Sequence, residues 1–190
     1  EERLMKINIF EGYSYYIYVA FIVAALTEEG LKGIVLIPNL ITEKNFNEKL
    51  DGIIYSIFLS LGFATVENII YILFEDANVA FQVGIIRAII SIPAHIMFAI
   101  TMGYYTSKYK FSDDKIKKRE YLILAILIPI LFHGIFDFIL MVERKWSIIV
   151  FMVYIAFLWK INLDKLDYYT DNSKKRFFRR RKKKEKDDKC

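Results

Sequence analysis

The chain has 190 residues, of which 55% are hydrophobic and 26% are charged, and its formal net charge is +5. A soluble domain of this size seldom combines so much apolar sequence with so many charges, unless the charges are segregated from the apolar segments. They are segregated here, because 13 of the 27 Lys and Arg residues lie in residues 160–189, an asymmetry that indicates a membrane or a nucleic-acid partner. The single cysteine, Cys190, excludes an intrachain disulfide and a cysteine-based metal site.

Five apolar segments follow one another along the chain, and we expect each to be a membrane-spanning helix: residues 13–40, 51–74, 79–109, 121–142 and 146–161. A spanning helix needs about 20 residues, and the short fifth segment is flanked by Trp146 and Trp159, which favour the membrane interface. The segments are continuously apolar rather than alternating, which favours helices over strands. The sequence therefore predicts an all-α polytopic transmembrane helix bundle, with residues 1–161 as the membrane domain and residues 162–190 as a basic, flexible tail.

The basic residues predict the orientation of the bundle. Most of them lie in the tail and in the loops after the first and third segments, which alternation places on one side of the membrane. The positive-inside rule puts that side, and the C-terminus, in the cytoplasm of a multi-pass cell-membrane protein. We interpret the basic run 174–184 as a juxtamembrane segment that contacts anionic lipid rather than as a nucleic-acid site.

Ionisable residues remain inside the predicted spans, where each is costly and is by default a functional hypothesis. The set contains both histidines of the chain, and a purely structural bundle would not need it: Glu28, Glu29, Lys32, Glu67, Arg87, His95, His133 and Asp137.

The first span carries two adjacent carboxylates and a lysine. Glu28 and Lys32 are four residues apart and share a helix face, while Glu29 points about 100° away from Glu28. Such a carboxylate can act as a general base. The alternative is an interfacial stretch in which Lys32 extends towards water, but apolar residues 34–37 continue the span beyond it.

The later spans carry the remaining groups. Glu67 shares a helix face with Phe63, and Glu67 and Arg87 fall at a similar depth, so they could form a pair. The alternative for Glu67 is an ordinary ion pair near the interface. His133 and Asp137 are one turn apart, so the carboxylate could hold the imidazole, or the two could only stabilise the helix locally.

Depth connects the separate spans. At 1.5 Å per residue, Glu28, His95 and His133 each lie roughly 18–24 Å from the end at which their helix enters the membrane. Although a lone buried histidine is more often a packing residue than a catalyst, these three groups fall together near the middle of the membrane. The sequence therefore predicts that they converge on one site.

The chain resembles the PrsW family of bacterial membrane proteases, and more distantly the group that contains the CAAX prenyl peptidases. The resemblance covers about residues 26–137 and depends on four motifs that occur in order on successive spans: Glu28-Glu29-x-x-Lys32, Phe63-x-x-x-Glu67-Asn68, His95 and His133-x-x-x-Asp137. Lys32 and Glu67 favour PrsW over the prenyl peptidases. The chain departs from the family at its N-terminus, where little spanning sequence precedes the double glutamate.

The resemblance implies a peptidase of the cell membrane that cuts membrane-anchored proteins. The substrate class that it implies is an anti-sigma factor, cut at site 1 on its extracytoplasmic side as the first step of a stress-response cascade. It implies a catalytic set of Glu28, Glu29, Glu67, His95 and His133. The supporting residues would be Lys32, Phe63, Asn68, Arg87 and Asp137.

Two questions of chemistry stay open in the sequence. Glutamate-based catalysis is favoured and no cofactor is favoured, but zinc is possible because two histidines and a glutamate form a catalytic zinc set. The candidate ligands are Glu29, Glu67, His95 and His133. No His-Glu-x-x-His motif supports zinc locally. The alternative function is a proton-coupled or ion-conducting transporter that uses the same groups. Five spans without an inverted repeat argue against a transporter.

Overall fold

The structure is a computed structural model that describes residue 5, residues 10–142 and residues 144–187. Every regular element in this described part is helical, which confirms the predicted all-α bundle. In chain order the elements are α2 (Tyr13–Ile17), η1 (Tyr18–Ala25), α3 (Leu26–Thr42), α4 (Lys49–Phe74), α5 (Ala80–Lys110), α6 (Lys115–Met141) and α7 (Ser147–Asp187).

Four of these helices, α4, α5, α6 and the part of α7 from Ser147 to Arg179, are long and apolar enough to cross a membrane. The first predicted span corresponds to α2, the π-helix η1 and α3, which follow one another as one uninterrupted helical rod. The fifth predicted segment is only the first part of α7, which continues without a break through most of the basic tail. The domain division at residue 161 stays a prediction.

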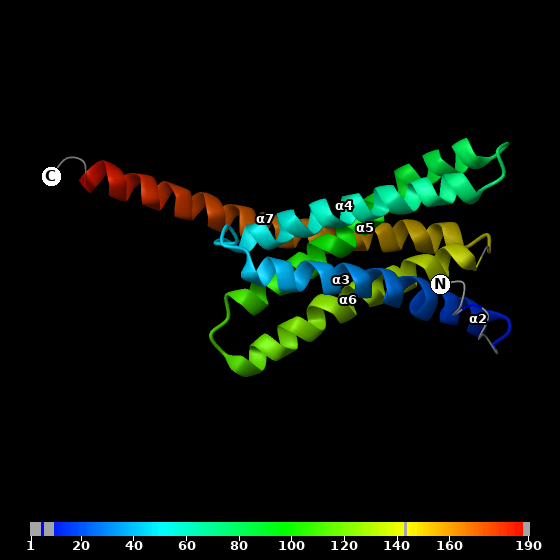
Figure 1. Cartoon of the computed structure of the whole chain (residues 1–190), viewed down its shortest axis with the longest axis horizontal. Helices are drawn as coiled ribbons and strands as arrows, with labels where there is room; N and C mark the ends of the chain where they lie inside the picture. The colour runs from blue at the N-terminus through cyan, green and yellow to red at the C-terminus, as the bar shows by residue number, and fades with distance from the viewer. Residues whose placement is uncertain (1–4, 6–9, 143, 188–190) are drawn as a thin grey trace.

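The helices are arranged around α5, which contacts α3, α4, α6 and α7. In Figure 1, α4 and α5 run as a hairpin, α3 lies beside α6, and the C-terminal part of α7 extends beyond the other helices. The largest apolar cluster joins side chains of α4, α5, α6 and α7: Ile53, Ala94, Met97, Phe98, Ile100, Phe136, Leu158 and Tyr169.

One end of the bundle is formed by the start of α4, the end of α5, the start of α6 and the second half of α7, and we refer to it as the tail end. The Glu48 carboxylate and the Asp51 carboxylate form a capping box at the start of α4. Glu48 also accepts a hydrogen bond from Ser173 of α7, and Arg176 donates to the carbonyl of Asn47 at 3.2 Å. These contacts hold the second half of α7 against the start of α4.

The α4–α5 contact depends on small residues. A Cβ atom added to Gly103 of α5 would collide with the carbonyl oxygen of Gly52 and would lie 2.6 Å from Oγ of Ser56 and 2.7 Å from Cα of Ile53. Since two of these atoms belong to the α4 backbone, a side chain could fit only if the helices moved apart. Small residues of this kind allow close backbone approach between helices in membranes.

We therefore predict that Gly103→Ala lowers the free energy of unfolding by about 1–3 kcal/mol, the usual cost of overpacking. The matched control is Gly62→Ala in the middle of α4, where an added Cβ meets no atom within 4 Å. This control should raise the free energy of unfolding by about 0.5–1 kcal/mol, because alanine favours helix more than glycine does. Denaturant unfolding in detergent measures both, and equal stabilities for the two variants would contradict the packing argument.

Candidate active site

Three helices bring their polar groups to one buried cluster, as the depth comparison predicts. Glu28, Glu29 and Lys32 lie on α3, His95 lies on α5 and His133 on α6. All five side chains are buried, and Glu29 is the most deeply buried of them. Glu28 and Glu29 lie in the first turn of α3 and Lys32 follows one turn later, whereas His95 and His133 lie well inside α5 and α6. The residues of the first motif, the third span and the fourth span therefore meet in space.

Lys32 is turned into this cluster rather than towards an interface. Its Nζ donates to Oε1 of Glu29 at 2.6 Å and lies 2.9 Å from Nδ1 of His95 and 3.8 Å from Oε2 of Glu28. The ammonium also lies 4.4 Å from the centre of the Phe63 ring, whose face attracts cations. The lysine therefore compensates the glutamate charge inside the bundle, where an unpaired carboxylate would be very costly.

Each histidine is held between the cluster and an outer carboxylate. Nε2 of His95 lies 3.1 Å from Oε2 of Glu67, and Nε2 of His133 lies 3.2 Å from Oδ2 of Asp137. In both rings Nδ1 is therefore the nitrogen that faces inwards. The local pair of His133 and Asp137 that the sequence suggests is present, but it also orients the imidazole towards Glu29.

His133 faces a carboxylate at both nitrogens, because its Nδ1 lies 3.1 Å from Oε1 of Glu29. A neutral imidazole has one N–H and one lone pair, so it can donate to only one of the two carboxylates. The contacts at both nitrogens are satisfied if His133 is an imidazolium that donates to Glu29 and Asp137, if one of the two carboxyl groups is protonated and donates to the ring, or if a cation lies between Nδ1 and Glu29. In each case an additional proton or cation belongs at this point.

Glu67 and Arg87 form the pair that their similar depth suggested, with Nη2 of Arg87 2.6 Å from Oε1 of Glu67. Because the other oxygen of Glu67 faces His95, the arginine fixes the carboxylate that orients the histidine. The Arg87 guanidinium also stacks on the Tyr71 ring at 3.6 Å. Sequence reasoning missed Tyr71, although its position one turn after Glu67 on α4 was a usable signal.

A second residue that the sequence analysis missed is Phe98, one turn after His95 on α5. Its ring is stacked on the His133 imidazole, with the centres 5.0 Å apart and an interplanar angle of 17°. Asn68 lies outside the cluster, because its amide donates to the carbonyl of Gly84 at 3.3 Å and so joins α4 to α5. The two motif residues Glu67 and Asn68 therefore have separate roles.

The cluster has the composition of a metal site. One ligand atom from each of four residues lies within 4.8 Å of the others: Glu28, Glu29, His95 and His133. In a tetrahedral zinc site the ligand atoms are about 3.3 Å apart, so the donors would need to move inwards slightly. Oε2 of Glu28 and Oε2 of Glu29 are buried and accept no hydrogen bond from the described residues. The sequence-predicted ligand Glu67 is not in this group.

The pattern of the outer carboxylates also fits a metal. Histidine ligands almost always donate their second ring N–H to a carboxylate or carbonyl, which turns the other nitrogen towards the ion. His95 with Glu67 and His133 with Asp137 both have this arrangement. The ligand atoms of the cluster therefore fit a zinc ion. The Lys32 ammonium would compete with zinc for two of them, Oε1 of Glu29 and Nδ1 of His95.

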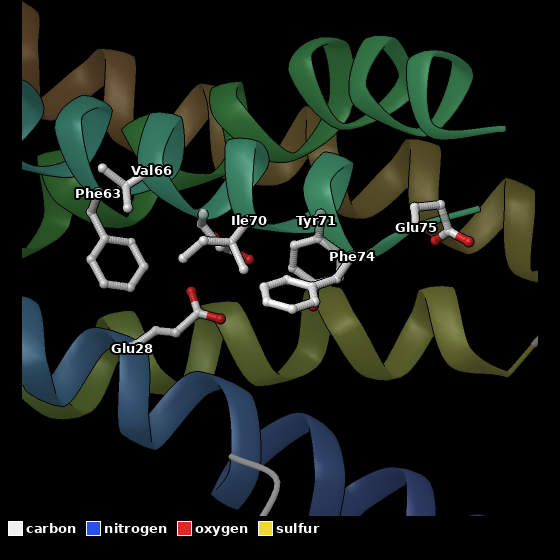
Figure 2. A pocket seen from close by; sticks show the side chains of 8 residues that line it. Glu28, Phe63, Val66, Ile70, Tyr71, Phe74 and Glu75 are labelled. Atoms are coloured by element: carbon white, nitrogen blue, oxygen red, sulfur yellow. The ribbon is translucent and has the colours of Figure 1, made fainter. Parts of the chain in front are cut away.

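A groove of about 650 Å³ leads to the cluster between α3 and α4, and Figure 2 shows its lining. Glu28 points into the groove from α3, and the apolar side chains project towards it from α4. The lining residues are Glu28, Phe63, Val66, Glu67, Ile70, Tyr71, Phe74 and Glu75. Glu28 is thus accessible from the groove, whereas Glu29 is enclosed by Lys32 and His133.

The π-helix η1 ends one residue before α3, which carries the double glutamate. Such wide turns occur frequently at functional sites. Here η1 places Phe21 directly against α6, because a Cβ added to Gly134 would collide with the Phe21 ring. The close contact lies beside His133 and helps to set the position of α3 relative to α6.

Comparisons of the chain with a family model and with known proteins both point to the same family. A family model described as PrsW family intramembrane metalloprotease matches residues 2–161. The chain is 67% identical over 174 residues to the Protease PrsW of Clostridioides difficile (strain 630), covering 92% of this chain and 73% of that protein. It is 36% identical over 148 residues to the Protease PrsW of Bacillus subtilis (strain 168), covering 78% of this chain and 65% of that protein. No solved structure matches the chain.

We predict that Lys32→Met lowers the free energy of unfolding by about 3–5 kcal/mol, because it leaves buried carboxylates without their cation. The double variant Lys32→Met/Glu29→Gln should recover part of this loss, since it also removes a negative charge. The control Lys44→Met removes an exposed lysine and should change stability by about 0.5 kcal/mol at most. Denaturant unfolding in detergent measures all three, and a Lys32→Met variant as stable as wild type would refute the charge-compensation argument.

Proposed function

The chain belongs to the PrsW family of intramembrane metalloproteases, and we propose that it hydrolyses a peptide bond of a membrane-anchored protein. The observation that carries the proposal is the buried cluster of two glutamates and two histidines at the end of an apolar groove. Peptide hydrolysis requires an activated water, stabilisation of the oxyanion and a proton for the leaving amine. The cluster contains a residue for each requirement.

Glu28 is the proposed general base. Of the two glutamates in the cluster, Glu28 is the one that lines the groove, from which water can reach its carboxylate. Its buried Oε2 accepts no hydrogen bond from the described residues, so this oxygen is not engaged by a protein donor. Glu28 can accept a proton from water and pass that proton to the leaving amine. Glu29 cannot serve as readily, because Oε1 already contacts Lys32 and His133.

Lys32 is the proposed electrostatic group. Its ammonium lies in the cluster beside Glu29 and His95, where it would stabilise the negative charge that develops on the carbonyl oxygen during hydrolysis. The two imidazoles are held from outside by Glu67 and Asp137, which turn both Nδ1 atoms towards the cluster. Because these groups are fixed before substrate binds, they need no rearrangement during the reaction.

Zinc is the proposed cofactor, with Glu29, His95 and His133 as the residues that would hold it. Two histidines and one glutamate form a recognised catalytic zinc set, and the description of the family as metalloproteases supports this choice over the glutamate-only chemistry that the sequence favours. A zinc ion there would supply a Lewis acid that polarises the scissile carbonyl. Glu28 would remain the base on the groove side.

The proposed substrate is an anti-sigma factor cut at site 1 on its extracytoplasmic side. We propose that the basic tail end is cytoplasmic, following the positive-inside rule. Since α4 begins at the tail end, Phe74 and Glu75 of the groove then lie towards the extracytoplasmic side. An apolar groove open at that level suits the membrane-flanking segment of a single-pass protein. The family resemblance supplies the substrate class.

Cleavage of a co-reconstituted single-pass anti-sigma factor tests the catalytic assignment. We expect Glu28→Gln to lower the rate of cleavage about 10²–10⁴-fold, the usual contribution of a general base. The matched control is Glu120→Gln, which makes the same substitution at an exposed position of α6 outside the groove and should keep the wild-type rate. Comparable cleavage by Glu28→Gln and wild type, with correctly inserted protein in both, would remove Glu28 from the mechanism.

Metal analysis of the purified protein tests the cofactor. We expect about one zinc per chain in wild type and none in His95→Ala, because the variant lacks one of the three proposed ligands. Glu67→Gln keeps every ligand but loosens His95, so zinc affinity should fall about 10–100-fold. Wild-type protein that cleaves substrate at full rate without any bound metal would instead establish the glutamate-only chemistry.

A further inference from the structure

A second group of cations, both half-buried, lies at the tail end, away from the candidate active site. Lys108 of α5 and Lys165 of α7 approach the same tyrosine, with their Nζ atoms 4.6 Å and 5.6 Å from the centre of the Tyr104 ring. Lys165 is also fixed by hydrogen bonds, donating to Oγ1 of Thr101 at 2.8 Å and to Oδ1 of Asn162 at 3.3 Å. Its ammonium therefore has a defined position between α5 and α7.

Further rings surround the two ammonium groups. Tyr105 lies 5.8 Å from Nζ of Lys108 and 6.0 Å from Nζ of Lys165, and Tyr121 of α6 lies 5.3 Å from Nζ of Lys108. The faces of these rings attract cations, but a ring quadrupole is not a negative charge and cannot balance two positive charges.

Within the described part of the chain, no carboxylate forms an ion pair with these lysines. Among the described residues, no carboxylate oxygen lies within 4.0 Å of either ammonium group, and Thr101 and Asn162, which accept hydrogen bonds from Lys165, are neutral. The distances to Tyr104 place the two ammonium groups at most about 10 Å apart, so they repel each other. Lys32 shows how this chain compensates a cation deep in the bundle, and the contrast indicates that the counter-charge of Lys108 and Lys165 comes from outside the chain.

The position of the group suggests the source of that charge. Lys108 lies in the last turn of α5, and Tyr121 lies in the second turn of α6, so the group is at the level where these helices leave the membrane. Both lysines are half-buried rather than enclosed, and an anion can reach them. Basic pockets between spanning helices on the cytoplasmic side bind the head groups of anionic lipids.

We propose that Lys108 and Lys165, together with Tyr104, Tyr105 and Tyr121, form a binding site for the phosphate of an anionic inner-leaflet lipid. The phosphate oxygens accept hydrogen bonds from both ammonium groups, and the tyrosine rings form the wall of the site. The inference depends on the cytoplasmic placement of the tail end, and it is independent of the peptidase chemistry. The lipid would join α5, α6 and α7 at this end of the bundle.

Native mass spectrometry of the delipidated full-length chain in detergent tests the proposal, with phosphatidylglycerol and phosphatidylcholine of identical acyl chains as probes. We expect wild type to bind one phosphatidylglycerol in preference to phosphatidylcholine. Lys108→Gln should weaken phosphatidylglycerol binding about tenfold, because a charge-assisted hydrogen bond is lost. The matched control Lys117→Gln removes an exposed lysine of α6 at the same end and should bind like wild type.

Lys165→Gln should give a similar loss, but it also removes hydrogen bonds to Thr101 and Asn162, so Lys108→Gln is the decisive variant. Equal binding of the two lipids, or equal losses in Lys108→Gln and Lys117→Gln, would overturn the site. Soluble glycerophosphoglycerol, added as a competitor, tests whether the bound phosphate belongs to a lipid or to a soluble compound. We expect it to compete only weakly, and binding as tight as that of the lipid would overturn a lipid ligand in favour of a soluble phosphate.

Discussion

The ion pair between Lys32 and Glu29 is the interaction on which the rest of this structure depends. Two adjacent carboxylates in the middle of an apolar bundle would be prohibitively costly if both were charged and unpaired. Lys32, one turn further along α3, supplies a cation at 2.6 Å from Glu29, and His133 approaches the same oxygen from α6. The helices can therefore pack closely around the cluster only in the arrangement that keeps these contacts.

The outer carboxylates extend the same principle. Glu67 and Asp137 each lie on the far side of a histidine, so that every imidazole is held at both nitrogens. Glu67 is in turn paired with Arg87. Moving outwards from the cluster, a histidine is followed by a carboxylate. Between α4 and α5 this series continues from His95 and Glu67 to Arg87, which stacks on Tyr71. Such a network places the reactive groups accurately because each ring has little freedom to rotate.

The middle and the tail end of the bundle differ in how their charges are compensated. In the middle, the chain compensates its own ions with partners from several helices. At the tail end, Lys108 and Lys165 are surrounded by neutral tyrosine, threonine and asparagine side chains, an environment that suits an anion supplied by the membrane surface. The groove lies on another side of the molecule, between α3 and α4, so substrate and lipid would not compete for the same surface.

The sequence by itself determined the helices, the depth of the buried polar residues and the pairs within one helix, such as His133 with Asp137. These features follow from hydrophobicity, from the 1.5 Å rise and from the 3.6-residue period, which are all local. The tertiary structure alone decided that Lys32 contacts Glu29 more closely than Glu28, that Glu67 serves both Arg87 and His95, and that Glu28 faces the groove. Helical periodicity sets directions within one helix, but the rotation of each helix against its neighbours is set by side-chain packing at contacts such as Gly52 with Gly103.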